Sequence, residues 1–162
     1  MPKEIKRRFL LKRFPTNTSP DFCPGCTGIE QHYFVYNEKG AARVRLEGSR
    51  CLLTVKSSGL MVREEDEWNI GEIQFKAFKS VALGSILKDR YFYKSRARDF
   101  CVDAFKGTLK GLYVLEVEFP SIEEAQEYDL PGWAVDALEV THDSRYTNAS
   151  LAVHGLPPDF ER

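Results

Sequence analysis

Charged and apolar residues alternate one by one in several separate segments of the chain. Arg43, Arg45 and Glu47, for example, are interleaved with Val44 and Leu46. Successive side chains of a β-strand point to opposite faces, so each such segment puts its charges on one face and its apolar side chains on the other. The pattern predicts eight strands, at about residues 3–12, 30–36, 41–47, 50–58, 62–70, 88–95, 98–105 and 111–119.

One longer segment, residues 71–87, is predicted to form a helix. It has apolar residues at helical spacing, which would bring them together on one face. These residues are Ile73, Ala77, Phe78 and Val81. Turns are expected between several of the strands, because glycine and asparagine adopt the backbone conformations of tight turns. The expected turn residues are Asn37, Gly40, Gly48 and Gly59.

Two shorter helices are predicted nearer the C-terminus. Ser121 is followed three residues later by Glu124, which is the capping-box pattern of a helix start, and this helix runs to about Tyr128. A further helix is expected over residues 143–153, with Gly155 at its C-terminal cap.

The strands carry charges of both signs on one face, which predicts the shape of the fold. One strand of this kind is an ordinary surface strand, but a whole set is typical of a sheet that closes into a barrel with a polar interior. The fold class is therefore predicted to be mainly β, an eight-stranded antiparallel closed barrel with a few flanking helices. The 162 residues form one domain, 1–162. A lumen lined with lysine, arginine and glutamate suits a polyanion and its metal ion.

Composition restricts the partners. The chain has 23 basic and 24 acidic residues and a net charge of −1, whereas a general nucleic-acid binder has a basic excess. No apolar run approaches the roughly 20 residues that span a bilayer, so no membrane partner is expected. The N-terminus is charged within three residues and has no signal-peptide pattern, which predicts a cytoplasmic protein. The sequence leaves open whether the protein is a monomer or a homodimer.

The four cysteines give a weak signal. Cys23 and Cys26 form a CxxC pair around Pro24 and Gly25, but a structural zinc site needs four ligands. His32 could supply a third ligand and nothing supplies a fourth. We interpret the pair as part of a tight loop, and Cys51 and Cys101 as small buried apolar residues.

The order of the motifs resembles one known family. Glu4-Ile-Lys-Arg-Arg-Phe9 resembles the N-terminal Glu-x-Glu-x-Lys signature of the CYTH, or triphosphate tunnel metalloenzyme, superfamily. The resemblance covers nearly the whole chain and is closest to the short bacterial branch. Its further parts are Ile29–Tyr33, Arg43-Val-Arg45, Thr54-Val-Lys56, Arg63-x-Glu65-x-Glu67, Lys88-Asp-Arg90-Tyr91, Val102-Asp103, Glu116-Val-Glu118, Pro131-Gly-Trp133, Glu139-Val-Thr141, Asp143–Asn148 and Leu151-Ala152.

The resemblance implies a metal-dependent triphosphatase that hydrolyses inorganic tripolyphosphate or a nucleoside triphosphate inside the barrel with Mg²⁺ or Mn²⁺. Guanidinium and ammonium groups suit phosphate oxygens, and hard divalent ions prefer carboxylate oxygens. The implied substrate-binding residues are Lys6, Arg8, Arg43, Arg45, Lys56, Arg63, Lys88, Arg90 and Arg145, the last reaching the tunnel from the C-terminal helix. The implied metal ligands are Glu4, Glu65, Glu67, Asp103, Glu116 and Glu118. The implied catalytic residues are Glu4, Arg8, Lys88, Arg90 and Glu118.

The chain departs from the family pattern at a metal-holding position. The second glutamate of the signature is Lys6 here and its lysine is Arg8, and Ala104 stands where relatives often carry an acid. A cation at position 6 would repel Mg²⁺ and attract a phosphate. Two alternatives therefore stay open. One is a tunnel that binds polyphosphate or a nucleotide without turnover, and the other is an adenylate cyclase or thiamine triphosphatase.

Overall fold

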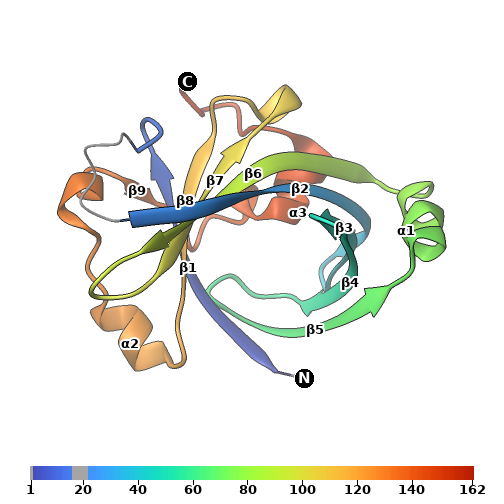
Figure 1. Cartoon of the computed structure of the whole chain (residues 1–162), viewed down its shortest axis with the longest axis horizontal. Coiled ribbons are helices and arrows are strands. Elements are labelled where there is room, and N and C mark those ends of the chain that lie inside the picture. Colours follow the sequence, from blue (N-terminus) through green and yellow to red (C-terminus); the bar gives the residue numbers. More distant parts are fainter. Residues whose placement is uncertain (1, 16–21) are drawn as a thin grey trace.

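Eight antiparallel strands close into a barrel in the computed structural model, which describes residues 2–15 and 22–162 (Figure 1). The mainly β class and the closed barrel are thus confirmed. The strands follow the order β5-β4-β3-β2-β6-β7-β8-β1, and β1 pairs with β5 to close the ring. Their bounds are β1 (Lys3–Leu11), β2 (Phe22–Asn37), β3 (Gly40–Glu47), β4 (Arg50–Ser57), β5 (Val62–Ile70), β6 (Gly84–Lys94), β7 (Phe100–Phe105) and β8 (Tyr113–Glu118).

Strand β1 makes the closure by changing partners along its length. Residues 3–5 pair with residues 62–64 of β5, and residues 6–11 pair with residues 113–118 of β8. A two-residue strand, β9 (Leu138–Glu139), lies against the C-terminal part of β1. Because β1 pairs with one strand on each side, its side chains point alternately into the lumen and to the outside of the barrel.

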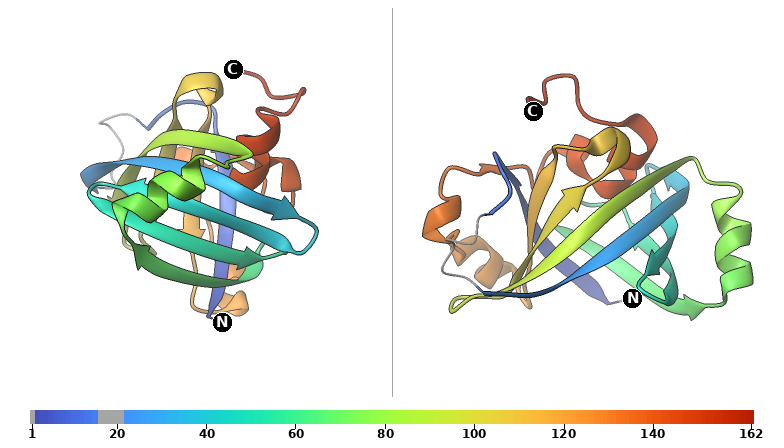
Figure 2. Two further views of the ribbon diagram at one scale, coloured as in Figure 1. Left: turned by 90° about the vertical axis from the view of Figure 1, so that its right-hand side faces the viewer. Right: turned by 45° about the horizontal axis from the view of Figure 1, so that its top comes forward.

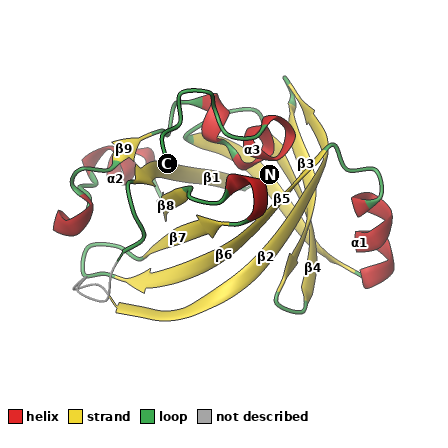
Figure 3. Cartoon of the chain, turned by 90° about the horizontal axis from the view of Figure 1, so that it is seen from above, coloured by secondary structure: helices red, strands yellow, loops and turns green. Residues whose placement is uncertain are grey.

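Short helices surround the barrel (Figures 2 and 3). Helix α1 lies at one end, where it connects β5 to β6, and α2 lies at the opposite end of the molecule. Helix α3 packs on β6 and β2. The helices of the described residues are α1 (Glu72–Lys79), α2 (Ile122–Glu127), α3 (Asn148–His154) and the 3₁₀ turns η1 (Gly107–Leu109), η2 (Gly132–Ala134) and η3 (Ser144–Tyr146).

Two apolar clusters stabilise the barrel. The first lies between the outer face of β1 and β8 and the segment that contains α2, and it includes Phe9, Val117 and Ala125. The second brings together Ile86, Phe105 and α3 residues such as Ala149 and Leu151. Ile86 shares its strand face with Lys88, so this second cluster fills the part of the lumen beside α3.

Gly84 permits the close approach of α3. A Cβ atom at this position would lie 2.1 Å from the carbonyl oxygen of Ala152, a distance that real Cβ atoms do not reach. A side chain here would therefore push α3 away from β6. The predicted cap of α3 is confirmed, since Gly155 follows the helix with a φ of 77°.

The prediction of a long helix over residues 71–87 is wrong. Helix α1 ends at Lys79, and β6 already begins at Gly84. Two of the apolar residues expected on one face of that helix, Ile73 and Val81, are 82% and 64% exposed. The Leu83 amide donates to the Tyr33 carbonyl, which starts the pairing of β6 with β2. Pairing with the distant strand β2, and not the helical spacing of the apolar residues, thus determines the structure of this segment.

Two further predictions are corrected. The expected single helix over residues 143–153 is two elements, η3 and α3, separated at Thr147, whose hydroxyl accepts from the Ser150 amide and caps α3. Cys23 and Cys26 do not form a tight loop, because β2 begins at Phe22 and includes them, with a register shift between Phe22 and Gly25. No helix within residues 2–15 and 22–162 is long and apolar enough to cross a membrane.

Candidate active site in the barrel lumen

Most of the predicted cationic side chains converge on the interior of the barrel. Each is less than 9% exposed, although lysine and arginine are rarely buried in soluble proteins. They come from four strands, β1, β3, β4 and β6, so closure of the sheet brings together residues far apart in the sequence. These buried cations are Lys6, Arg8, Arg43, Arg45, Lys56 and Lys88.

A cavity lies among them, which we call the central cavity. Its lining includes Lys6, Arg43, Arg45 and Lys56 from the strands and Asn148 from α3. Its volume is about 20 Å³, so the lining side chains nearly fill it. The predicted residues Arg63, Arg90 and Glu116 also line it.

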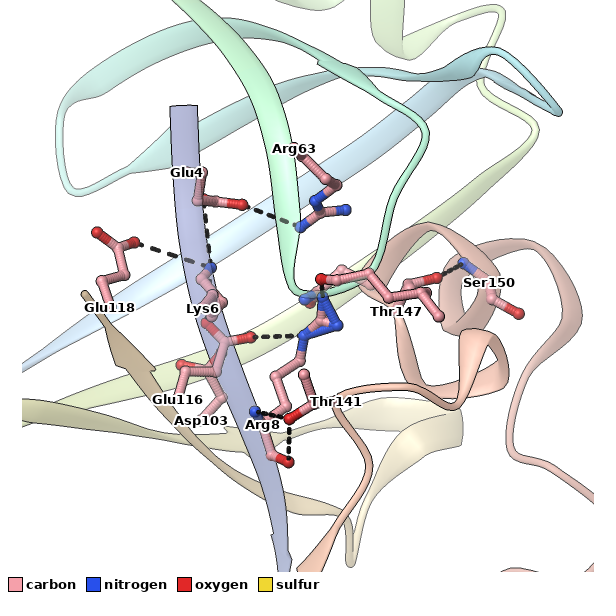
Figure 4. Close-up of polar contacts among 12 residues, drawn as sticks. Glu4, Lys6, Arg8, Arg63, Asp103, Glu116, Glu118, Thr141, Thr147 and Ser150 are labelled. Carbon is pink, nitrogen blue, oxygen red and sulfur yellow. Dashed lines mark hydrogen bonds and ion pairs between the residues drawn. The ribbon is translucent and has the colours of Figure 1, made fainter. Parts of the chain in front are cut away.

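Glu4 lies at the centre of a cluster of cations (Figure 4). Its carboxylate is 3.1 Å from Lys56 Nζ, 3.1 Å from Arg63 Nη2 and 3.5 Å from Lys6 Nζ. Burial alone would raise the pKa of Glu4, but Lys6 and Lys56 hold it well below its usual range. Glu4 is therefore anionic, and its charge is shared among three cations.

Lys6 is surrounded by carboxylates in turn. Its Nζ is 3.1 Å from Glu116, 3.5 Å from Glu4 and 3.8 Å from Glu118. Burial disfavours the charged ammonium, but Glu116 and Glu4 outweigh it and raise the pKa of Lys6. The ammonium thus takes a place where several oxygens meet.

Asp103 organises a second ion cluster deeper in the lumen. It is fully buried, accepts from Arg90 through both carboxylate oxygens at 2.7 and 2.8 Å, and lies 2.7 Å from Lys88 Nζ. Lys88 also donates to Asn148 Oδ1 at 2.9 Å, which links β6 to α3. Burial lowers the pKa of Lys88 to about 7, since repulsion from Arg90 adds to it and Asp103 offsets it only in part.

Glu116 joins the two clusters. Its carboxylate lies 3.1 Å from Lys6 Nζ, 3.2 Å from Arg90 Nη2 and 4.0 Å from Arg8 Nε. Burial would raise its pKa, but Lys6 and Arg90 hold it well below the usual range. The lumen is thus a connected network of alternating charges.

Arg43 and Arg45 are less well compensated than the other cations. Arg43 donates to the Tyr33 hydroxyl at 3.0 Å, and Arg45 lies 3.9 Å from a Glu47 oxygen. Burial and repulsion from Arg43 and Arg90 lower the pKa of Arg45 to about 10. Both guanidinium groups face the central cavity.

Several buried donors in the lumen lack a hydrogen-bond partner among the described residues. They are Nη1 of Arg8, Nε of Arg43 and Nε of Arg45. A buried charged donor without a partner is costly, so such groups point to a ligand or to ordered water. Three guanidinium donors around one lumen fit the oxygens of a polyanion.

The remaining predicted acids lie on β5 and β8, two strands that pair with β1. Glu65 is 3.1 Å from Lys56 Nζ, Glu67 accepts from the Thr54 hydroxyl at 2.8 Å, and the Glu118 side chain is 70% exposed. Together with Glu4 and Asp66 they line a cavity of about 390 Å³, which we call the acidic mouth.

The carboxylates do not form a metal cage as they stand. No group of three or more histidine, cysteine, aspartate or glutamate side chains within the described residues is arranged to hold a metal ion. Asp103 and Glu116 are occupied by cations, and the oxygens around Lys6 already surround its ammonium. The ligand set expected from the resemblance therefore does not fit a resident ion in this arrangement.

The structure places the Arg145 side chain outside the tunnel that it was expected to reach. Its side chain is 48% exposed and pairs with Asp143 and Asp159, both at 2.7 Å. Asp143 precedes η3 and also accepts from the Arg145 amide, so local partners hold this side chain outside the lumen.

The sequence analysis missed polar residues that complete the lumen. Tyr33 accepts from Arg43, Asn148 accepts from Lys88, and Gln31 is fully buried with an Oε1 atom that has no partner in the described part of the chain. Gln31 and Tyr33 lie directly opposite Arg45 and Arg43 in the β2–β3 register. Their two-residue spacing was the available signal, but uncharged side chains in a partly apolar strand are not distinctive.

Comparison with known proteins shows close relatives over almost the full length. No protein-family model matches the chain. An inorganic triphosphatase of Nitrosomonas europaea is 33% identical over 153 residues, which are 93% of this chain and 97% of that protein. An inorganic triphosphatase of Acetivibrio thermocellus is 30% identical over 158 residues, 93% of this chain and 94% of that protein.

Solved structures agree with the sequence relatives. The crystal structure of the inorganic triphosphatase NE1496 is 31% identical, with a TM-score of 0.66 over 94% of this chain and 99% of that chain. The Hippeastrum protein HpAC1 has a TM-score of 0.54 over 76% of this chain and 82% of that chain; at 16% identity it supports the fold alone. The chain therefore belongs to the inorganic triphosphatase family, within the CYTH or triphosphate tunnel superfamily.

Proposed function

We propose that the protein binds inorganic tripolyphosphate, or the triphosphate of a nucleotide, in the barrel lumen and hydrolyses its terminal phosphoanhydride bond. The observation that carries the proposal is the set of buried guanidinium donors of Arg8, Arg43 and Arg45 that lack partners among the described residues. The names of the relatives support the same activity, since two of them are inorganic triphosphatases.

The role of each residue in binding or hydrolysis would depend on its position in the lumen. Arg43, Arg45 and Lys56 line the central cavity and would neutralise the phosphate chain, while Lys88 and Arg90 would stabilise the charge that develops on the reacting group. Water attacks the terminal phosphorus, the bond to the bridging oxygen breaks, and tripolyphosphate yields pyrophosphate and phosphate. Positioning and charge neutralisation supply most of the rate in this kind of reaction.

Among the predicted site residues, the carboxylates most exposed to solvent are those of the acidic mouth. Glu118 is the most exposed of the carboxylates that lie within 4 Å of a lumen cation. Its side-chain oxygen is 3.8 Å from Lys6 Nζ. It could accept a proton from the attacking water, with Glu4 beside it in the same mouth. Glu65, Glu67 and Glu118 are the carboxylates that would face Mg²⁺ or Mn²⁺ at this mouth, and such an ion would neutralise charge on the triphosphate.

A second candidate function is a tunnel that binds polyphosphate without turnover. It is favoured by Lys6, whose ammonium lies among Glu4, Glu116 and Glu118. The cytoplasmic location stays a prediction, and the choice between a monomer and a homodimer stays open.

Phosphate release tests the proposal. Tripolyphosphate, ATP, thiamine triphosphate and pyrophosphate are each incubated with the protein, with and without Mg²⁺ or Mn²⁺. We expect release from tripolyphosphate and little from pyrophosphate, since the shorter anion reaches fewer of the cations. Binding by calorimetry without any turnover would favour the second candidate, and formation of a cyclic nucleotide from ATP would favour a cyclase.

A double variant tests the site itself. Changing Arg43 and Arg45 together to methionine should weaken tripolyphosphate binding by several kcal/mol, at about 1.5–3 kcal/mol for each charged hydrogen bond lost. Arg50→Met is the matched control, because Arg50 begins β4 at an exposed position. Equal affinities of the double variant and the control would exclude a site in the lumen.

A further inference from the structure

The environment of Lys6 differs from that of the other lumen cations. Lys6 is 7% exposed, and its Nζ lies within 4 Å of three different carboxylates, those of Glu4, Glu116 and Glu118. Figure 4 shows Lys6 next to Glu4 on β1, with dashed lines from Lys6 to Glu4 and to Glu118. Convergent carboxylates of this kind are the usual surroundings of a hard divalent cation.

We infer that Lys6 is a built-in cation that takes the place of a divalent ion in the lumen, so that this chain binds tripolyphosphate without a divalent metal. The inference rests on the proposed function, because it concerns the same site. It goes further by stating how the bound anion is neutralised.

The position of the ammonium supports this role. Lys6 lines the central cavity together with Arg43 and Arg45, so its Nζ is available to the same ligand as they are. An ammonium has three N–H donors, and it can hold a carboxylate and a phosphate oxygen at once. A divalent ion that bridges carboxylates and phosphates does the same with coordinate bonds.

The charges around Lys6 explain why its ammonium and a divalent metal ion would exclude one another. The lumen places Lys56 and Arg63 around Glu4, and Arg90 beside Glu116, so the oxygens near Lys6 are already shared with further cations. A dication added there would be repelled by the ammonium in a region where water screens little. Replacing Lys6 with glutamate would change the local charge by two, which is the charge of one Mg²⁺ ion.

A purely structural role for Lys6 is the alternative. Lys6 lies opposite Glu118 in the β1–β8 register, so its ion pairs could simply hold these two strands together. In that case the metal requirement of ligand binding would not depend on Lys6. The two roles therefore predict a different dependence of tripolyphosphate affinity on Mg²⁺, which can be measured without turnover.

Calorimetry of tripolyphosphate binding in EDTA and in excess Mg²⁺ tests the inference. We expect the wild-type protein to bind in EDTA with an affinity within about threefold of that in Mg²⁺. Lys6→Glu should lose about 100-fold or more in EDTA, because it removes one charged contact and adds a repulsion, and should recover in Mg²⁺. Lys39→Glu, at an exposed turn between β2 and β3, makes the same charge change outside the lumen and should behave like the wild-type protein.

Metal binding in the absence of phosphate gives a second readout. Mn²⁺ titration followed by electron paramagnetic resonance should detect one additional tightly bound ion in Lys6→Glu relative to the wild-type protein. A wild-type protein that binds tripolyphosphate only in Mg²⁺ would overturn the inference and leave the proposed function intact. A wild-type protein that binds tripolyphosphate in neither condition would contradict both. The wild-type comparison needs no variant, so it stands even where Lys6→Glu does not fold.

Discussion

Asp103 offers the sharpest test of how the lumen network affects stability. Its carboxylate is fully buried and meets Arg90 through two hydrogen bonds and Lys88 through one. Asp103→Asn keeps the shape of the side chain and removes its charge. Lys88 would then retain Asn148, and Arg90 would retain Glu116 at 3.2 Å.

The expected loss of stability follows from the uncompensated charges. Removing one partner of a buried ion pair typically costs about 3–5 kcal/mol, because the other charge stays buried. For a domain of this size, 1 kcal/mol shifts the unfolding temperature by roughly 2–4 °C, so Asp103→Asn should lower it by roughly 6–20 °C. Bound tripolyphosphate should reduce this loss, since its oxygens supply the missing negative charge to Lys88 and Arg90.

Urea unfolding of the wild-type protein and two variants measures the effect. Asp99→Asn is the control, because Asp99 pairs with Lys94 at the surface, where both side chains are more than half exposed. We expect no measurable change in its unfolding midpoint. The reasoning would be refuted if Asp103→Asn unfolded at the same urea concentration as Asp99→Asn.

The pH dependence checks the cause of the loss. Burial would raise the pKa of Asp103, but Arg90 and Lys88 hold it below the usual value. Its stabilising charge is therefore present above the unfolded-state pKa near 4 and is lost as the pH falls towards the lower folded-state pKa. The difference in unfolding free energy between the wild-type protein and Asp103→Asn should shrink over that acidic range. A difference independent of pH would mean that Asn disturbs packing rather than charge.

Two further outcomes follow from the site. Because the pKa of Lys88 is lowered to about 7, the ammonium loses its proton above that pH, and tripolyphosphate affinity measured by calorimetry should fall between pH 7 and 9. Lys88→Arg should remove most of that fall relative to the wild-type protein, and an equal fall in both would assign it to another group. Arg145→Ala should leave tripolyphosphate affinity unchanged, since Arg145 is paired with Asp143 and Asp159 outside the lumen; a tenfold weaker affinity would restore it to the site.

The sequence predicts the strands well because the same alternation of charged and apolar residues recurs in many separate segments. Arg43 and Arg45 in β3, and Lys88 and Arg90 in β6, project into the lumen as the two-residue spacing requires. Eight such segments of suitable length leave few arrangements other than a closed sheet. The charges that mark the site are also the charges that mark the strand faces, so fold and site are predicted together.

The errors occur where local spacing competes with contacts that the sequence does not reveal. Ile73 and Val81 have helical spacing but lie on an exposed surface, and β6 begins at Gly84 because β2 offers it hydrogen bonds. Arg145 was assigned to the tunnel by resemblance, whereas Asp159 reaches it from 14 residues further along the chain. The partner of β6 is distant in sequence, whereas Arg145 is held both by the neighbouring Asp143 and by Asp159.

The lumen is better explained as a binding site than as a source of stability. Buried ion pairs contribute little net stability, since the desolvation of two charges offsets most of their attraction. Glu4, Asp103 and Glu116 compensate part of the cationic charge, yet guanidinium donors of Arg43 and Arg45 still lack partners in the described part of the chain. A network selected for stability would pair these donors, whereas a polyanion would complete them. The protein should therefore be more stable with tripolyphosphate bound, in proportion to the affinity, as any ligand that binds only the folded state requires.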